Sequence, residues 1–178
     1  MPVKIRETAL SAITGAAYAS LTVLLSSLSY GPIQFRVSEV LCVLPFYFPS
    51  MSWGLFAGCA LANIISGAGV YDMIFGSLAT LIAALLTARI GKPYRETDAL
   101  PGTGASLLAC LMPVFVNAPV VGAVLAFTLV PHEAFWPSLL LFGAQVGLGE
   151  LAIMTLAGLP LLRTIPRLLA VKNKGVFG

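Results

Sequence analysis

Residues 105–131 read ASLLACLMPVFVNAPVVGAVLAFTLVP, an apolar stretch without a single charged side chain. A helix needs about 20 apolar residues to cross the hydrocarbon core of a bilayer, so this stretch predicts a membrane span. The whole chain has the same character, with 58% hydrophobic residues, 10% charged residues and a mean hydropathy of +0.96. Because soluble domains carry roughly 25% charged residues, we predict an all-α membrane protein.

Five further apolar segments surround this stretch. The predicted spans are Thr8–Leu28, Val40–Phe48, Trp53–Ile65, Met73–Ala88, Ala105–Pro131 and a last one that starts at Trp136 and fades between Pro160 and Arg167. A chain of 178 residues has room for at most about six crossings with short loops. Residues 1–178 are therefore expected to form a single transmembrane domain, and no cleavable signal peptide is expected.

The second span is short and contains Pro45, so residues 37–65 can also be interpreted as one broken helix, which would give five crossings. The basic residues favour six. They gather at the N-terminus, in a loop predicted between Arg89 and Pro101, and at the C-terminus. Only six crossings place all three groups on the cytoplasmic side, with both termini inside. The net charge of +3 follows from these flanks, so no nucleic-acid partner is expected.

With this topology, several polar residues fall near the outer face or inside the spans. The candidate substrate-binding residues are Gln34, Arg36, Glu39, Asn63, Asp72, Asn117, Gln145 and Glu150. Glu150 is the most informative, because a carboxylate near the middle of a spanning helix costs about 2.5–3.5 kcal/mol unless a partner offsets it.

Structural roles remain open for the same residues. Glu150 can pair with Arg36 or bridge two helices as a buried acid. The side chains of Asn63 and Asn117 can form hydrogen bonds between helices. Asp72 begins a predicted helix, where a carboxylate caps free backbone N–H groups.

Motifs for catalysis, nucleotide binding and metal binding are missing from the sequence. It contains no P-loop, no GxGxxG and no GxSxG pattern. The three cysteines have neither CxxC spacing nor neighbouring histidines, so we interpret them as buried thiols. His132 and Glu133 are expected to be solvated. We expect neither an enzyme nor a cofactor, and any uphill transport must draw on an ion gradient or on partner subunits.

Four alanines, Ala9, Ala12, Ala16 and Ala19, form one stripe on the first predicted span. Small residues at this spacing allow close helix approach. The stripe can pack inside the bundle or dock on a partner membrane protein.

The chain resembles the substrate-binding (S) subunits of energy-coupling-factor (ECF) transporters, in their queuosine-precursor branch. The resemblance lies in Tyr30–Glu39, Trp53–Asn63 and Asp72–Thr80, together with the AxxxA pattern Ala12–Ala16. It implies six helices with both termini cytoplasmic and a site near the outer face. It also implies a transmembrane coupling subunit that docks at Ala12 and Ala16, two ATPase subunits, and a bacterial plasma membrane as the location.

The ligand that this resemblance implies is a 7-deazaguanine such as preQ1 or preQ0. A guanine-like edge offers adjacent donors to a carboxylate, and the cationic aminomethyl group of preQ1 needs a second acid. Glu39, Glu150 and Asp72 are the candidates for these roles, and Phe35, Tyr71 or Phe115 for stacking on the ring. The alternatives are an S subunit for another vitamin, a stand-alone proton-coupled carrier using Glu150, and a purely structural membrane subunit.

Overall fold

The computed structural model describes residues 3–30, 34–66, 68–97 and 99–174, and these are helical with no strand among them. Their helices are α1 (Val3–Leu24), α2 (Ser26–Ser29), η1 (Val37–Phe46), α3 (Met51–Asn63), α4 (Gly69–Tyr71), η2 (Asp72–Gly76), α5 (Ser77–Thr97), α6 (Thr103–Leu129), η3 (His132–Ala134), α7 (Phe135–Ile153), η4 (Met154–Gly158) and α8 (Leu159–Lys174). The predicted turn at Gly31-Pro32 lies outside the described residues, as do Gly67 and Asp98.

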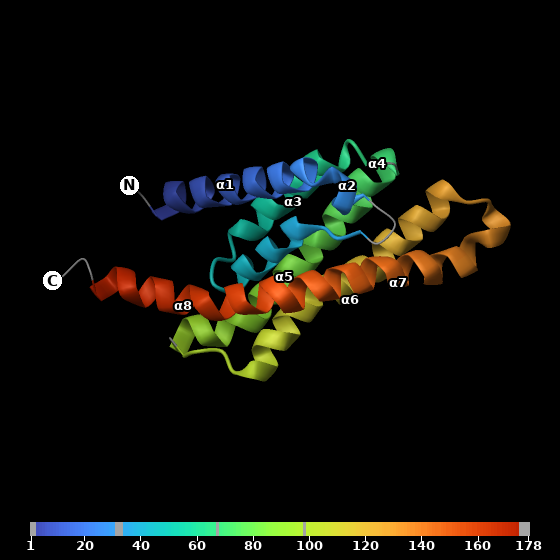
Figure 1. The fold of residues 1–178 in the computed structure, drawn as a ribbon. Helices are drawn as coiled ribbons and strands as arrows, with labels where there is room; N and C mark the ends of the chain where they lie inside the picture. Colours follow the sequence, from blue (N-terminus) through green and yellow to red (C-terminus); the bar gives the residue numbers. More distant parts are fainter. Residues whose placement is uncertain (1–2, 31–33, 67, 98, 175–178) are drawn as a thin grey trace.

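Three helical stretches in the described part of the chain are long and apolar enough to cross a membrane: Gly69–Thr97, Thr103–Leu129 and His132–Leu168. The other three predicted spans correspond to α1, η1 and α3. The N-terminal end of α1 and the C-terminal end of α8 lie at the same end of the bundle, while α2, α4 and the α6–α7 turn lie at the other (Figure 1).

Small residues allow close approach at two helix contacts. On α3, Gly54 and Gly58 lie directly against the backbone of Ser11 and Gly15 on α1, where a Cβ atom would collide with a carbonyl oxygen. On α6, Gly122 lies in the same way against Gly143 of α7. Gly54 and Gly58 are four residues apart, a spacing that lets helices in membranes approach closely.

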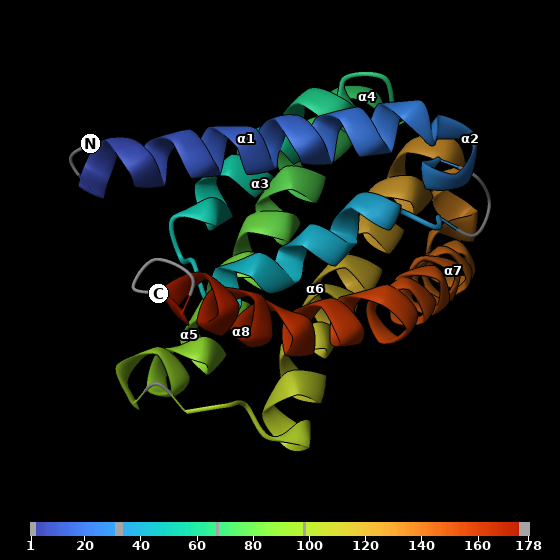
Figure 2. The ribbon, with the colours of Figure 1, turned by 60° about the vertical axis from the view of Figure 1, so that its left-hand side comes forward.

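The short helix η1 lies inside the bundle, in contact with α1, α5, α6, α7 and α8 (Figure 2). It is a 3₁₀ helix of 10 residues, longer than the usual run of three or four, and it includes Pro45. A 3₁₀ helix rises about 2 Å per residue, so ten residues reach about 20 Å where an α-helix would reach about 15 Å. Cys42, Val43 and Phe46 are fully buried on it. The stretched helix thus places a short segment through the centre of the fold.

Two predicted boundaries are wrong. Residues from Arg89 onward were expected to form a loop, but α5 continues to Thr97, because Arg, Lys and Glu are good helix formers and Pro93 does not end it. The last helix was expected to fade between Pro160 and Arg167, yet α8 continues to Lys174. A charged sequence ends the membrane-crossing part of a helix without ending the helix itself.

Candidate functional site

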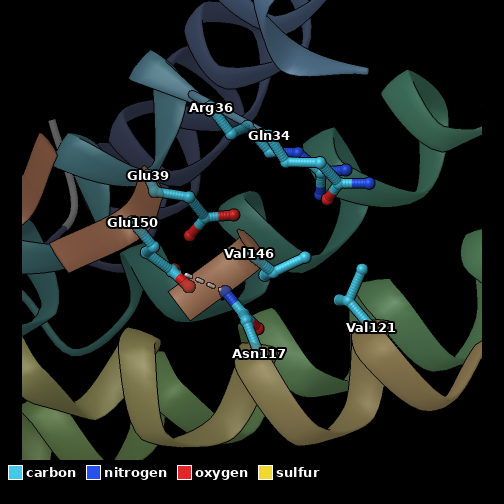
Figure 3. Close-up of a pocket in the computed structure, with 7 residues that line it drawn as sticks. All are labelled: Gln34, Arg36, Glu39, Asn117, Val121, Val146 and Glu150. Carbon is cyan, nitrogen blue, oxygen red and sulfur yellow. Dashed lines mark hydrogen bonds between the residues drawn. The ribbon is translucent and has the colours of Figure 1, made fainter. Parts of the chain in front are cut away.

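A small polar cavity lies in the interior, between η1 and the facing sides of α6 and α7 (Figure 3). Its lining residues are Gln34, Arg36, Glu39, Asn117, Val121, Val146 and Glu150. About 10 Å³ is open to the centre of a water-sized sphere, which is space for about one water molecule. The cavity therefore brings Glu39 and Arg36 together with Glu150, more than 100 positions later in the sequence.

Glu39 belongs to the first turn of η1, and its carboxylate is fully engaged by neighbouring side chains. The Tyr18 hydroxyl on α1 donates to Oε1, and the Cys42 thiol donates to Oε2 at 3.0 Å. One residue before it, the Ser38 hydroxyl lies 2.6 Å from the Thr22 hydroxyl on α1. These contacts attach the start of η1 to α1.

Glu150 lines the cavity from α7 on the opposite side. Among the described residues, only one of its two carboxylate oxygens has a hydrogen-bond partner. The Asn117 amide on α6 donates to Oε1 at 2.7 Å. Glu150 Oε2 and Asn117 Oδ1 are buried without a hydrogen-bond partner in the part of the chain that the structure describes. Since a buried polar atom without a partner costs about 1–3 kcal/mol, these two acceptors are suited to a water molecule or a ligand.

Arg36 precedes η1 and is the only cation among the lining residues of the cavity. Its Nη2 lies 3.9 Å from Oδ2 of Asp72, an ion-pair distance that is too long for a hydrogen bond. Arg36 Nε and Nη2 and both carboxylate oxygens of Asp72 have no hydrogen-bond partner among the described residues. Arg36 and Asp72 therefore keep unpaired hydrogen-bond donors and acceptors on this side of the cavity.

Asp72 and Asn63 form a second layer behind Arg36. The Asn63 amide donates to the backbone carbonyl of Asp72 at 3.0 Å. Gly76, one turn further along the π-helical segment η2, leaves the space for both side chains, because a Cβ at this position would meet them. Such π-helical turns occur often at functional sites.

Tyr30, the residue after α2, lies next to Arg36. Its hydroxyl donates to the Ala62 carbonyl at 2.6 Å, and its ring centroid lies 5.7 Å from the Arg36 guanidinium carbon. Burial raises the pKa of the Tyr30 phenol, while the positive charge of Arg36 acts in the opposite direction. Tyr30 therefore remains a neutral donor and a cation–π partner of Arg36.

The structure separates the eight sequence-predicted site residues into three groups. Five of them line the cavity, namely Gln34, Arg36, Glu39, Asn117 and Glu150. Asn63 and Asp72 lie behind Arg36. Gln145 does not line the cavity and is only half-buried. Of the proposed stacking residues, Tyr71 and Phe115 are largely exposed.

Several structural alternatives can be compared with the geometry. Glu150 forms no ion pair with Arg36 among the described residues, but it does join α6 and α7 through Asn117. Asp72 makes no capping hydrogen bond at a helix start. His132 and Glu133 are exposed, as expected.

Three of the four alanines of the stripe on α1 do not pack within the bundle, and Ala19 is half-buried. Ala9, Ala12 and Ala16 are exposed, whereas Gly15 on the adjacent face is buried against α3.

Sequence reasoning missed Tyr18, Val121 and Val146, which carry no motif and are recognised only by their position in the fold. In the part of the chain that the structure describes, no group of three or more His, Cys, Asp or Glu residues is arranged to hold a metal ion.

Comparison with known proteins adds independent information. Residues 8–167 match the family model described as QueT transporter. A relative in Lactococcus lactis subsp. cremoris (strain MG1363), the queuosine precursor transporter QueT, is 39% identical over 87 residues, which are 48% of this chain and 51% of the relative. The match thus spans about half the length of that protein. No solved structure matches the chain. Together with the long apolar helices, the family match, which covers most of the sequence, indicates a membrane protein and shows that the chain belongs to the QueT transporter family.

Proposed function

We propose that this chain is the substrate-capture subunit of an ECF-type importer and that it binds a queuosine precursor, a 7-deazaguanine such as preQ1 or preQ0. Family membership and the queuosine-precursor relative support the substrate class. The observation that carries the proposal is the buried cavity with unpaired donors on Arg36 and unpaired acceptors on Asn117 and Glu150. A planar heterocycle with donors and acceptors on its edges satisfies such a set.

The charge balance of the site favours a cationic ligand. Glu39, Asp72 and Glu150 are 2%, 0% and 4% exposed, and Arg36, at 6%, is the one buried basic residue in the part of the chain that the structure describes. Three carboxylates against one guanidinium leave a surplus of negative charge in a medium where an unpaired charge is costly. The aminomethyl group of preQ1 offsets that surplus and the uncharged nitrile of preQ0 does not, so we expect preQ1 to bind more tightly.

The geometry also suggests a division of roles. Glu150 Oε2 and Asn117 Oδ1 are adjacent unpaired acceptors, suited to the N–H donors of a guanine-like edge. Arg36 offers donors to a ring carbonyl. Asp72 lies behind Arg36 with both oxygens unpaired and is the acid that we assign to the ammonium group.

The cavity is much smaller than a purine, so binding requires the surrounding side chains to separate. Gln34 and Arg36 are the lining residues outside the helices, and they can move with less loss of packing than Asn117 or Glu150, which are held within α6 and α7. We therefore expect the ligand to enter past Gln34 and Arg36, which lie directly before η1.

Partner subunits complete the proposal. The exposed stripe with Ala12 and Ala16 suits close docking by a helix of a transmembrane coupling subunit. Two ATPase subunits would supply the energy, because the chain has no nucleotide-binding motif. We place the protein in a bacterial plasma membrane with six spans and both termini cytoplasmic, and with the basic ends of its helices on the inner side.

Calorimetric titration of the purified, detergent-solubilised chain with preQ1, preQ0, queuine and guanine tests the substrate. We expect selective binding of a deazaguanine, with preQ1 above preQ0. Absence of binding by all four compounds would refute the proposal and favour an S subunit for another vitamin. Uptake by proteoliposomes that contain this chain alone, abolished by a protonophore, would instead support a proton-coupled carrier.

A further inference from the structure

A second cavity lies between α8 and the residues that lead into α6. The ribbon places this part of α8 towards the end of the bundle where α1 begins (Figure 1). Its lining residues are Leu100, Pro101, Thr103, Arg163, Pro166 and Arg167. About 190 Å³ is open to the centre of a water-sized sphere, far more than in the interior cavity. The two cavities share no residue, so this one has no part in the proposed substrate site.

Two exposed arginines give this cavity its chemistry. Arg163 and Arg167 are four residues apart on α8, so they lie on the same face, about 6 Å apart along the helix axis. Neither forms an ion pair with a carboxylate in the described part of the chain. Thr103 begins α6 on the opposite wall, and the first N–H groups of a helix have no partner within it. Guanidinium groups, a hydroxyl and backbone N–H groups together suit a phosphate.

The apolar neighbours of the arginines distinguish a lipid from a free phosphate. Leu100 is 74% exposed on the cavity wall, and Leu168, next to Arg167, is 62% exposed. Exposed leucines beside exposed arginines are typical of the membrane interface, where basic side chains reach the headgroups and apolar ones enter the acyl region. A site for a soluble phosphate has no need of such leucines.

We propose that Arg163 and Arg167, with Leu100, Pro101 and Thr103, form a binding site for the phosphate headgroup of an anionic phospholipid. The site lies towards the end of the bundle where α1 begins and α8 ends (Figure 1), and further basic residues, Arg89 and Lys92, belong to the C-terminal half of α5. Basic pockets between helices on the cytoplasmic side of membrane proteins are suited to anionic headgroups. The proposal is independent of which substrate the interior cavity binds.

Native mass spectrometry of the purified full chain in neutral detergent tests the site, with phosphatidylglycerol and phosphatidylcholine of identical acyl chains as probes. We expect preferential retention of phosphatidylglycerol. The variant R163Q/R167Q is expected to lose that preference, with binding about fivefold weaker for each arginine removed. The matched control R89Q/K92Q removes two exposed charges from α5 outside the cavity and is expected to keep the preference.

Three results would overturn the proposal. Equal retention of the two lipids would remove the anionic selectivity, and an equal loss in R89Q/K92Q would reduce it to general charge attraction. Competition by millimolar inorganic phosphate that displaces the lipid completely would assign the site to a soluble phosphate. The single variants R163Q and R167Q repeat the test with a smaller perturbation, and each is expected to weaken phosphatidylglycerol binding by about fivefold.

Discussion

Two buried glutamates line the same interior cavity, and they differ in what their carboxylates contact. Glu39 on η1 accepts hydrogen bonds on both oxygens, from Tyr18 and Cys42. Glu150 on α7 accepts one from Asn117 and keeps its second oxygen unpaired. The sequence makes both of them candidate ligand-binding acids, yet Glu39 holds η1 against α1 while Glu150 keeps an oxygen free for a ligand. Burial alone therefore does not identify a ligand-binding carboxylate.

Removing the buried cation Arg36 should have the largest effect. Replacing Arg36 by Met leaves Asp72 buried without a counter-charge, and loss of one partner of a buried pair costs about 3 kcal/mol or more. The free energy of unfolding, measured by SDS titration in mixed micelles, should fall by this amount. Arg89→Met, at an exposed arginine, should change it by less than about 0.5 kcal/mol.

The double variant R36M/D72N tests the reason for this loss. It removes both charges and should recover part of the stability lost in R36M. If R36M/D72N were no more stable than R36M, the pairing between Arg36 and Asp72 would not be the cause.

Glu150→Gln should have the next largest effect, on ligand affinity. It replaces a charge-assisted acceptor by a neutral amide, a loss of about 1.5–3 kcal/mol, or about 10–100-fold in the dissociation constant for preQ1. Calorimetry measures this change, and Glu133→Gln provides a control at an exposed acid near the α6–α7 turn. Unchanged affinity in Glu150→Gln would show that the unpaired oxygen does not face the ligand.

Glu39→Gln should affect the free energy of unfolding more than the affinity for preQ1. Tyr18 can still donate to the amide oxygen, but the Cys42 thiol loses its acceptor, at a cost of about 1 kcal/mol in the free energy of unfolding. The affinity for preQ1 should change less than in Glu150→Gln. A greater loss of affinity than in Glu150→Gln would assign the base edge to Glu39 and contradict the comparison.

Gln145→Ala should have the smallest effect. The side chain is half-buried on α7 and does not line the cavity. We expect the dissociation constant for preQ1 to stay within about twofold of the wild-type value, as is usual for substitutions away from a site. A tenfold loss would show that the bound form of the protein turns this part of α7 towards the ligand.

Prediction from sequence succeeded where a single physical preference acts along the chain. Apolar runs such as residues 105–131 predict helices because lipid leaves no other way to satisfy backbone groups, and this stretch is indeed one helix from Thr103 to Leu129. The rule that buried charges are costly selected Glu150, which is buried, whereas Glu39 and Asp72 were expected near the outer face and are buried as well. The apolar pattern could not predict the end of α5 at Thr97. It marks where a helix leaves the apolar core, and the helix itself can continue beyond that point.

By itself, the sequence determined that this protein is helical, that its interior holds acids and amides, and that its basic residues gather at the helix ends. These properties follow from composition and from the cost of placing polar groups among apolar ones. Only the tertiary structure decided that Glu150 meets Asn117, that Glu39 is engaged by Tyr18, and that Gln145 lies outside the cavity. The reason is geometric: which face of a helix meets which neighbour depends on close contacts such as Gly122 against Gly143, and those join residues that no local pattern connects.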